Sequence, residues 1–216
     1  MQINEKLISE NFDISKDRDI NFIIVHDTGN TNRGADANAH YKFFSTYQGR
    51  SAHYFVDDTQ ILRIVKDEHN AWHVGDGKGK YGIKNSNSIG IEMCINAGSN
   101  RDKMKKNTLD LIVHLMKVHN VPFSNVLRHY DASRKICPKS MSANNWKEWG
   151  EFKATLYEML NPKELEGMVK IEYKGKTMLI PGLLQDGKNY VAVRDLLESM
   201  GYSVGWDTDK KVVLVK

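Results

Sequence analysis

The chain has 216 residues, of which 40% are hydrophobic and 27% charged, and its formal net charge is +4. This length and composition predict a soluble globular protein with one domain of ordinary size and a small second one. The positive charge is mild and spread along the chain, so it does not predict nucleic-acid binding. The sequence has no apolar run of about 18 residues, which argues against insertion into a membrane.

The two cysteines, Cys94 and Cys137, are too few for a disulfide framework. We expect both thiols to be reduced, and one or both can serve as metal ligands. Residues 1–20 lack the basic start and apolar run of a secretory signal. We therefore expect synthesis in the cytoplasm without an export signal in this segment.

Strands and helices alternate along the first 160 residues. The run INFIIVHDTGN (20–30) is apolar and rich in β-branched residues, and it predicts a buried strand with His26 at its exit. The other expected elements are a helix at 34–48, a hairpin at 51–66, a strand or loop at 70–75, a strand at 87–96, a helix at 105–121, a strand at 126–132 and a helix at 144–160. This order predicts an α/β or α+β domain built on one mixed β-sheet.

The stretch LRHYDASRKICPKS (127–140) brings His129, Lys135 and Cys137 together in the sequence. With His26, the histidine and the cysteine can supply two nitrogen ligands and one sulfur ligand. A catalytic zinc site commonly has three such protein ligands and an open position for water. The spacing is not that of a zinc finger, so the pattern alone does not separate a zinc site from three unrelated structural side chains.

Glu92 lies in the otherwise apolar run 87–96, and alternation places it on the same face as Cys94. A buried carboxylate needs a reason, so Glu92 fits a general base at the mouth of a site, with a raised pKa. The alternative is an edge strand whose glutamate faces water. Lys135 fits a group that polarises a carbonyl oxygen, and the alternative is a solvated loop lysine. We expect Cys94 to be a small buried apolar residue.

Five separated motifs between residues 20 and 160 resemble the zinc-dependent N-acetylmuramoyl-L-alanine amidases, above all the phage and prophage endolysins and the bacterial autolysins. The motifs are IIVHDTGN, SAHYFVDD, AWHVG, NSIGIEMC and RHYDASRKICP. The resemblance implies a mixed sheet flanked by helices. It also implies a Zn²⁺ cofactor and cleavage of the bond between N-acetylmuramic acid and L-alanine in Gram-positive peptidoglycan.

Carried over by position, the resemblance implies that His26, His129 and Cys137 are the zinc ligands. Glu92 matches the acid that assists the zinc-bound water, and Lys135 matches the positively charged residue near the zinc that stabilises the oxyanion. It further implies four substrate-binding residues: His53, Tyr54, Trp72 and His73. One branch of the family has a tyrosine in the place of His53, so this chain departs from that pattern.

After Leu160 the composition changes. Residues 161–168 are predicted to form a linker, and residues 169–216 a small α+β domain whose short helix ends at Gly201. This part resembles a stalk-type repeat of wall-associated proteins and the N-terminal domain of copper amine oxidases. The resemblance implies wall binding or self-association into a homo-oligomer, and the alternative is a passive spacer.

Two other functions fit the same motifs. A peptidoglycan-binding protein without activity would keep the fold, and a zinc peptidase would cut within the stem peptide. Because residues 1–20 carry no secretory signal, we expect action at the cell wall after lysis or through holin pores, as for an endolysin.

Overall fold

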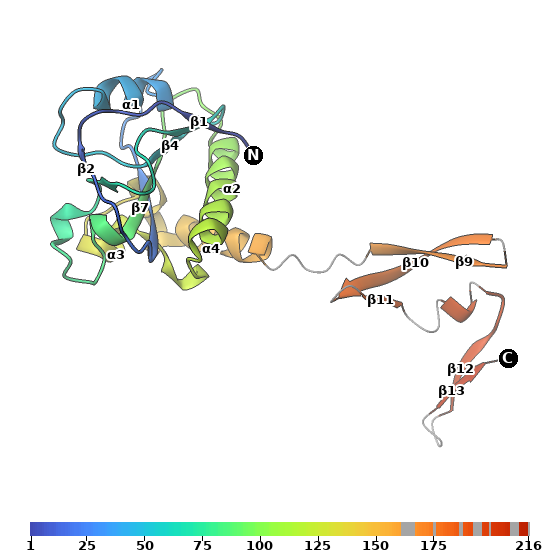
Figure 1. Cartoon of the computed structure of the whole chain (residues 1–216). Helices are drawn as coiled ribbons and strands as arrows, with labels where there is room; N and C mark the ends of the chain where they lie inside the picture. Colours follow the sequence, from blue (N-terminus) through green and yellow to red (C-terminus); the bar gives the residue numbers. More distant parts are fainter. Residues whose placement is uncertain are drawn as a thin grey trace. The chain divides into compact units, whose positions relative to one another are not determined.

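A computed structural model of the chain (Figure 1) describes residues 1–160, 167–174, 176–185, 188–191, 196–198, 200–207 and 212–215. The chain forms two compact units, Met1–Leu160 and Asn161–Lys216. Within the described ranges, none of the helices combines the length and the apolar character that a bilayer crossing requires.

The first unit is built on a six-stranded sheet in the order β1-β5-β4-β7-β3-β8. Only the β4–β5 pair is antiparallel. The strands are β1 (Ile3–Glu5), β3 (Phe22–Asp27), β4 (Tyr54–Val56), β5 (Ile61–Arg63), β7 (Ser88–Met93) and β8 (Val126–Arg128), with a separate small pair of β2 (Phe12–Asp13) and β6 (Asn70–Ala71). The helices are α1 (Ala37–Phe44), α2 (Arg101–His119), α3 (His129–Ser133) and α4 (Ala143–Leu160), with short 3-10 turns η1 (Gly75–Gly77), η2 (Asn85–Asn87), η3 (Phe123–Asn125) and η4 (Lys139–Met141). This arrangement confirms the predicted mixed sheet flanked by helices.

The two faces of the sheet have different partners, as strand alternation requires. Val25 and Ile91 point to the face covered by α2 and α4, where the main hydrophobic core lies. On the opposite face, Phe55, Glu92 and His26 form one row, because Phe55 and His26 are both register partners of Glu92. A smaller cluster that includes Phe44 of α1 covers one end of that face.

The helix expected at 34–48 ends earlier, at Phe44, for a reason that lies elsewhere in the chain. The buried Asn11 side chain donates to the carbonyl oxygens of Phe44 and Thr46, both at 2.9 Å. Its Oδ1 accepts from the backbone nitrogens of Gln48 at 2.6 Å and Gly49 at 3.1 Å. These bonds hold residues 44–49 in a bend, so the helix cannot continue.

The strand expected at 126–132 is also shorter, because it turns into α3 at His129. Asp131 accepts from the backbone nitrogen and the Nε of Arg128, both at 2.9 Å, and so caps the helix start. The predicted helix at 144–160 matches α4, whose first turn is left-handed at Asn144, Asn145 and Trp146.

The second unit contains a three-stranded antiparallel sheet of β9 (Gly167–Tyr173), β10 (Lys176–Gln185) and β11 (Lys188–Val191), and a hairpin of β12 (Val204–Asp207) and β13 (Val212–Val215). β9 therefore begins two residues before the predicted domain start. Gly201 has the left-handed φ of 91° expected after a helix, and the Tyr202 nitrogen donates to the Leu197 oxygen at 3.0 Å. Residues 161–166, 192–195 and 199, in the predicted linker and helix, lie outside the described residues.

Candidate active site

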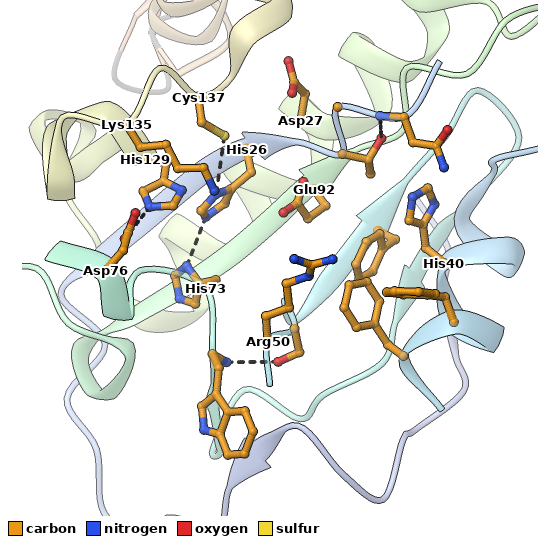
Figure 2. A pocket seen from close by; sticks show the side chains of 18 of the residues that line it. His26, Asp27, His40, Arg50, His73, Asp76, Glu92, His129, Lys135 and Cys137 are labelled. Atoms are coloured by element: carbon orange, nitrogen blue, oxygen red, sulfur yellow. Dashed lines mark hydrogen bonds and ion pairs between the residues drawn. The ribbon is translucent and has the colours of Figure 1, made fainter. Parts of the chain in front are cut away.

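A cleft of about 1000 Å³ opens on the face of the sheet that carries His26 and Glu92. One wall comes from α1 and the segment that follows it, and another from residues 135–137 and 139. Figure 2 shows the polar side chains of β3, β7 and the surrounding loops converging on this space.

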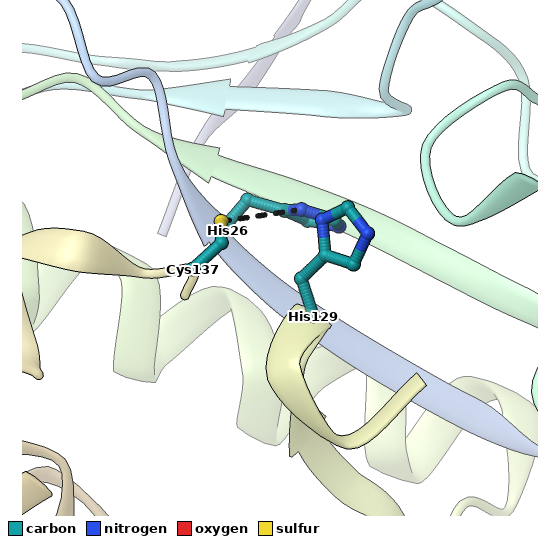
Figure 3. A group of neighbouring side chains, drawn as sticks. All are labelled: His26, His129 and Cys137. Atoms are coloured by element: carbon teal, nitrogen blue, oxygen red, sulfur yellow. Dashed lines mark hydrogen bonds between the residues drawn. The ribbon is translucent and has the colours of Figure 1, made fainter. Parts of the chain in front are cut away.

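His26, His129 and Cys137 meet at one end of the cleft (Figure 3). One nitrogen or sulfur atom of each lies within 4.8 Å of the others, and no second group of this kind occurs in the part of the chain described above. The Sγ of Cys137 is 3.7 Å from the Nδ1 of His26. All three side chains are buried. They come from β3, from the first residue of α3 and from the loop after α3.

A chain of hydrogen bonds fixes which nitrogen of His26 faces the cysteine. The Ser88 hydroxyl donates to the Lys84 oxygen at 2.6 Å, so it accepts from the Nε2 of His73 at 3.2 Å. The Nδ1 of His73 is then an acceptor, and the Nε2 of His26 donates to it at 3.1 Å. The Nδ1 of His26 is left with a free lone pair directed toward Cys137.

His129 is oriented in the same way by an acid. Its Nε2 donates to the Oδ1 of Asp76 at 2.8 Å, and its buried Nδ1 has no hydrogen-bond partner. Gly77 permits this contact, because a Cβ at that position would stand 2.3 Å from the carbonyl oxygen of Ala132. A histidine that donates one N–H to a carboxylate and offers the other nitrogen bare is the usual arrangement of a metal ligand.

The electrostatics of the cluster suit a cation. Burial, and then the neighbouring His73 and His129, lower the pKa of His26 well below its usual value. Burial also lowers the pKa of His129, although Asp76 opposes the shift. Neutral imidazoles are the form that binds metals. Burial raises the pKa of the Cys137 thiol to about 12, so its thiolate requires a cation beside it. The two nitrogens and the sulfur therefore fit the donor set of a zinc ion.

Glu92 lies beside this cluster on the central strand β7, not on an edge strand. It is half-buried, and its Oε2 has no hydrogen-bond partner. Burial, and then the nearby Asp27, raise the pKa of Glu92 well above its usual value, while Lys135 and Arg50 lower it. A carboxyl group whose pKa is raised in this way is suited to accept a proton and return it later in a reaction.

The structure places the remaining predicted residues in two groups. Lys135, which is exposed, lines the cleft together with Trp72 and His73. His53 and Tyr54 do not line it. The buried His53 accepts from the Gly90 nitrogen and donates to the His69 oxygen, both at 3.0 Å.

Tyr54 points to the other face of the sheet. It is buried in the main core, and its hydroxyl donates to Asp67 at 2.6 Å. Tyr54 and His53 are therefore fully engaged inside the fold, and neither is available to a ligand in the cleft.

Asp76 and Ser88 contribute to the site, although the motifs did not single them out. Asp76 sits between two glycines three residues after His73, which is a weak signal for a tight functional turn. Ser88 offers no signal in the sequence. Gly90 is needed for a different reason, because a Cβ there would stand 2.6 Å from the Cγ of His73.

We expect Gly90→Ala to lower zinc affinity about 10- to 100-fold, the usual loss when a partner behind a metal ligand is removed. The added methyl group would displace the His73 ring and so free the Nε2 of His26. Competition with a fluorescent chelator measures the affinity. Gly150→Ala is the matched control, since no atom lies within 4 Å of a Cβ at that exposed helical position. Equal zinc affinity in the two variants would contradict the orienting role of His73.

Comparison with known proteins identifies the family. Residues 16–140 match the model of the N-acetylmuramoyl-L-alanine amidase family. The amidase CwlH of Bacillus subtilis (strain 168) is 41% identical over 121 residues, which are 56% of this chain and 48% of the relative. The amidase XlyA of the same organism is 40% identical over 134 residues, which are 62% of this chain and 43% of the relative. The matches thus span about half the length of these relatives or less.

Solved structures agree with this assignment. The catalytic domain of XlyA superposes with a TM-score of 0.64 and 36% identity, covering 72% of this chain and 99% of that domain. The structure of PlyL gives a TM-score of 0.63 and 31% identity, covering 72% of this chain and 97% of that structure. Through residues 16–140, the chain belongs to the N-acetylmuramoyl-L-alanine amidase family.

Proposed function

We propose that this chain hydrolyses the amide bond between N-acetylmuramic acid and L-alanine in the peptidoglycan of Gram-positive cell walls. We further propose that it acts there after release from the cell. The observation that carries the proposal is the convergence of His26, His129 and Cys137 within 4.8 Å at the end of a cleft, beside a carboxyl group of raised pKa. Family membership supports the choice of the bond.

The three residues would hold a zinc ion, which when bound supplies Lewis acidity toward a carbonyl oxygen and lowers the pKa of a water molecule. Glu92 takes the proton of the attacking water and then delivers it to the departing amine of L-alanine. Lys135 reaches over the cleft from the adjacent loop and donates hydrogen bonds to the oxyanion. Asp76 and His73 hold the two imidazoles in the required tautomers.

The substrate contacts proposed for the cleft include Trp72, which is half-buried and lies on its wall. His73 is better suited to positioning His26 than to binding substrate, because its two ring nitrogens already contact His26 and Ser88. The internal hydrogen bonds of His53 and Tyr54 leave them out of the substrate contacts.

The test is a digest of purified Gram-positive peptidoglycan by the full chain, followed by analysis of new amino termini, new reducing ends and product masses. We expect new amino-terminal L-alanine without new reducing ends. Amino termini at another residue of the stem peptide would identify a peptidase instead. Binding to the wall without any cleavage would identify a recognition protein and would overturn the roles given to Glu92 and Lys135.

A further inference from the structure

Arg50 is a charged side chain in the cleft to which the mechanism assigns no role. It lines the same cavity as the metal-ligand cluster, and it is exposed. Figure 2 shows its guanidinium directed toward Glu92, in the space between His26 and His40. It makes no hydrogen bond or ion pair with any residue that the structure describes. The guanidinium therefore has all of its donors available in the cleft.

The backbone that carries Arg50 is held rigidly by a buried polar side chain. The four hydrogen bonds of Asn11 fix the segment from Phe44 to Gly49, immediately before Arg50. On the other side, the Ser51 hydroxyl donates to the Asn11 backbone oxygen at 2.6 Å. The Ser51 nitrogen donates to the Trp72 oxygen at 2.9 Å. Such an anchored loop lowers the entropy that a ligand contact from Arg50 would cost.

Glu92 does not neutralise Arg50. Arg50 is close enough to lower the pKa of Glu92, yet the two form no ion pair, and the Oε2 of Glu92 has no hydrogen-bond partner. The cleft thus presents an unpaired guanidinium next to Glu92, between the metal ligands and His40 (Figure 2). A planar guanidinium in this state matches a carboxylate with two parallel hydrogen bonds.

The chemistry of the proposed substrate indicates which of its groups is a carboxylate that Arg50 could bind. In muramyl peptides the lactyl carboxyl is consumed in the scissile amide, so the sugar side carries no charge. The residue after L-alanine continues the stem peptide through its side-chain carboxyl, so its α-carboxyl stays outside the peptide chain and is either free or amidated. An anion within reach of the scissile bond is therefore found on the peptide side.

We propose that Arg50 binds the free α-carboxylate of the stem-peptide residue that follows L-alanine, and so makes the enzyme prefer non-amidated peptidoglycan. This inference rests on the amidase function proposed above. Arg50 acts here as a specificity-determining residue, since it contacts the substrate away from the bond that is cleaved.

The test compares two synthetic muramyl dipeptides whose side-chain carboxyl is blocked as an amide in both, and which differ only in whether the α-carboxylate is free or amidated. We expect the wild type to show a kcat/KM about 10- to 100-fold higher for the free carboxylate, the value of a charge-assisted hydrogen bond pair. Arg50→Gln should remove the preference by lowering kcat/KM for that substrate alone. Arg50→Lys should keep part of the preference, because lysine retains the positive charge but cannot donate two parallel hydrogen bonds to one carboxylate. Arg101→Gln, which removes a guanidinium paired with Glu148 on α4, should leave the preference intact.

The results that would contradict the proposal separate the role of Arg50 from the amidase function. Equal cleavage of both dipeptides by the wild type would overturn the role of Arg50 and leave the amidase function standing. An equal loss on both substrates in Arg50→Gln would mean that Arg50 acts through Glu92 or through the fold, and not on the carboxylate. No cleavage of either dipeptide, together with no amino-terminal L-alanine from whole peptidoglycan, would overturn the amidase function and this inference with it.

Discussion

A Cys137→Ser variant is expected to lose zinc binding and amidase turnover while it keeps its fold. The Sγ of Cys137 lies 3.7 Å from the Nδ1 of His26, and a nitrogen of His129 lies within 4.8 Å of both. A serine hydroxyl ionises far less readily than a thiol and is a poor zinc ligand, so the site would retain only two nitrogens. The loss of affinity should exceed the roughly 10- to 100-fold typical of residues behind the ligands. Metal content after dialysis and release of L-alanine termini measure both effects.

The other cysteine provides the control. Cys94 is fully buried on the same face of the sheet, with its Sγ 3.9 Å from His40, and burial raises the pKa of its thiol above the usual range. Cys94→Ala should therefore lose some stability to the cavity that it creates, yet keep its zinc and its activity. Zinc should raise the melting temperature of the wild type and of Cys94→Ala, but not that of Cys137→Ser. Stoichiometric zinc in Cys137→Ser would exclude the sulfur ligand.

Glu92→Gln is expected to reduce kcat by about 10²- to 10⁴-fold and to retain zinc, since the change removes the proton acceptor and preserves the shape of the side chain. The carboxyl must be ionised to take a proton from water. Because its pKa is raised, the wild-type activity should fall on the acid side at a higher pH than an ordinary glutamate would give. That acid limb should be absent from the pH profile of Glu92→Gln.

A control variant at a distant glutamate, Glu148, separates the loss of the proton acceptor from a general loss of negative charge. Glu148 pairs with Arg101 and Lys105 on the helical side of the molecule. Glu148→Gln should leave kcat and its pH profile unchanged, because surface ion pairs contribute little and none of these three residues lines the cleft. If Glu92→Gln retained wild-type kcat, another group would have to be the base.

Strand periodicity and motif order predicted the parts of the site that lie on the sheet. Alternation along β7 places Glu92 and Cys94 on the face opposite Ile91, and the structure confirms that placement. The same rule, applied to β4, puts Tyr54 in register with Ile91 and so on the core face. The resemblance implied that Tyr54 binds substrate, because matching motifs by position takes no account of which face of the sheet a side chain occupies.

The parts of the site that lie on loops could not be predicted in the same way. Asp76 reaches His129 only because η1 packs against α3, a contact between residues 53 positions apart. Arg50 faces the cleft because Asn11, far away in the sequence, ends α1 at Phe44 and bends the chain. Local propensity contains no information about such long-range hydrogen bonds, so the helix expected at 34–48 was too long.

The most direct test of the zinc amidase assignment is a titration of zinc into chelator-treated protein, with release of amino-terminal L-alanine from peptidoglycan as the readout. We predict no release without zinc, and a rise that saturates at one zinc ion per chain. Full release by the zinc-free protein, or bound zinc without any release of L-alanine, would contradict the account.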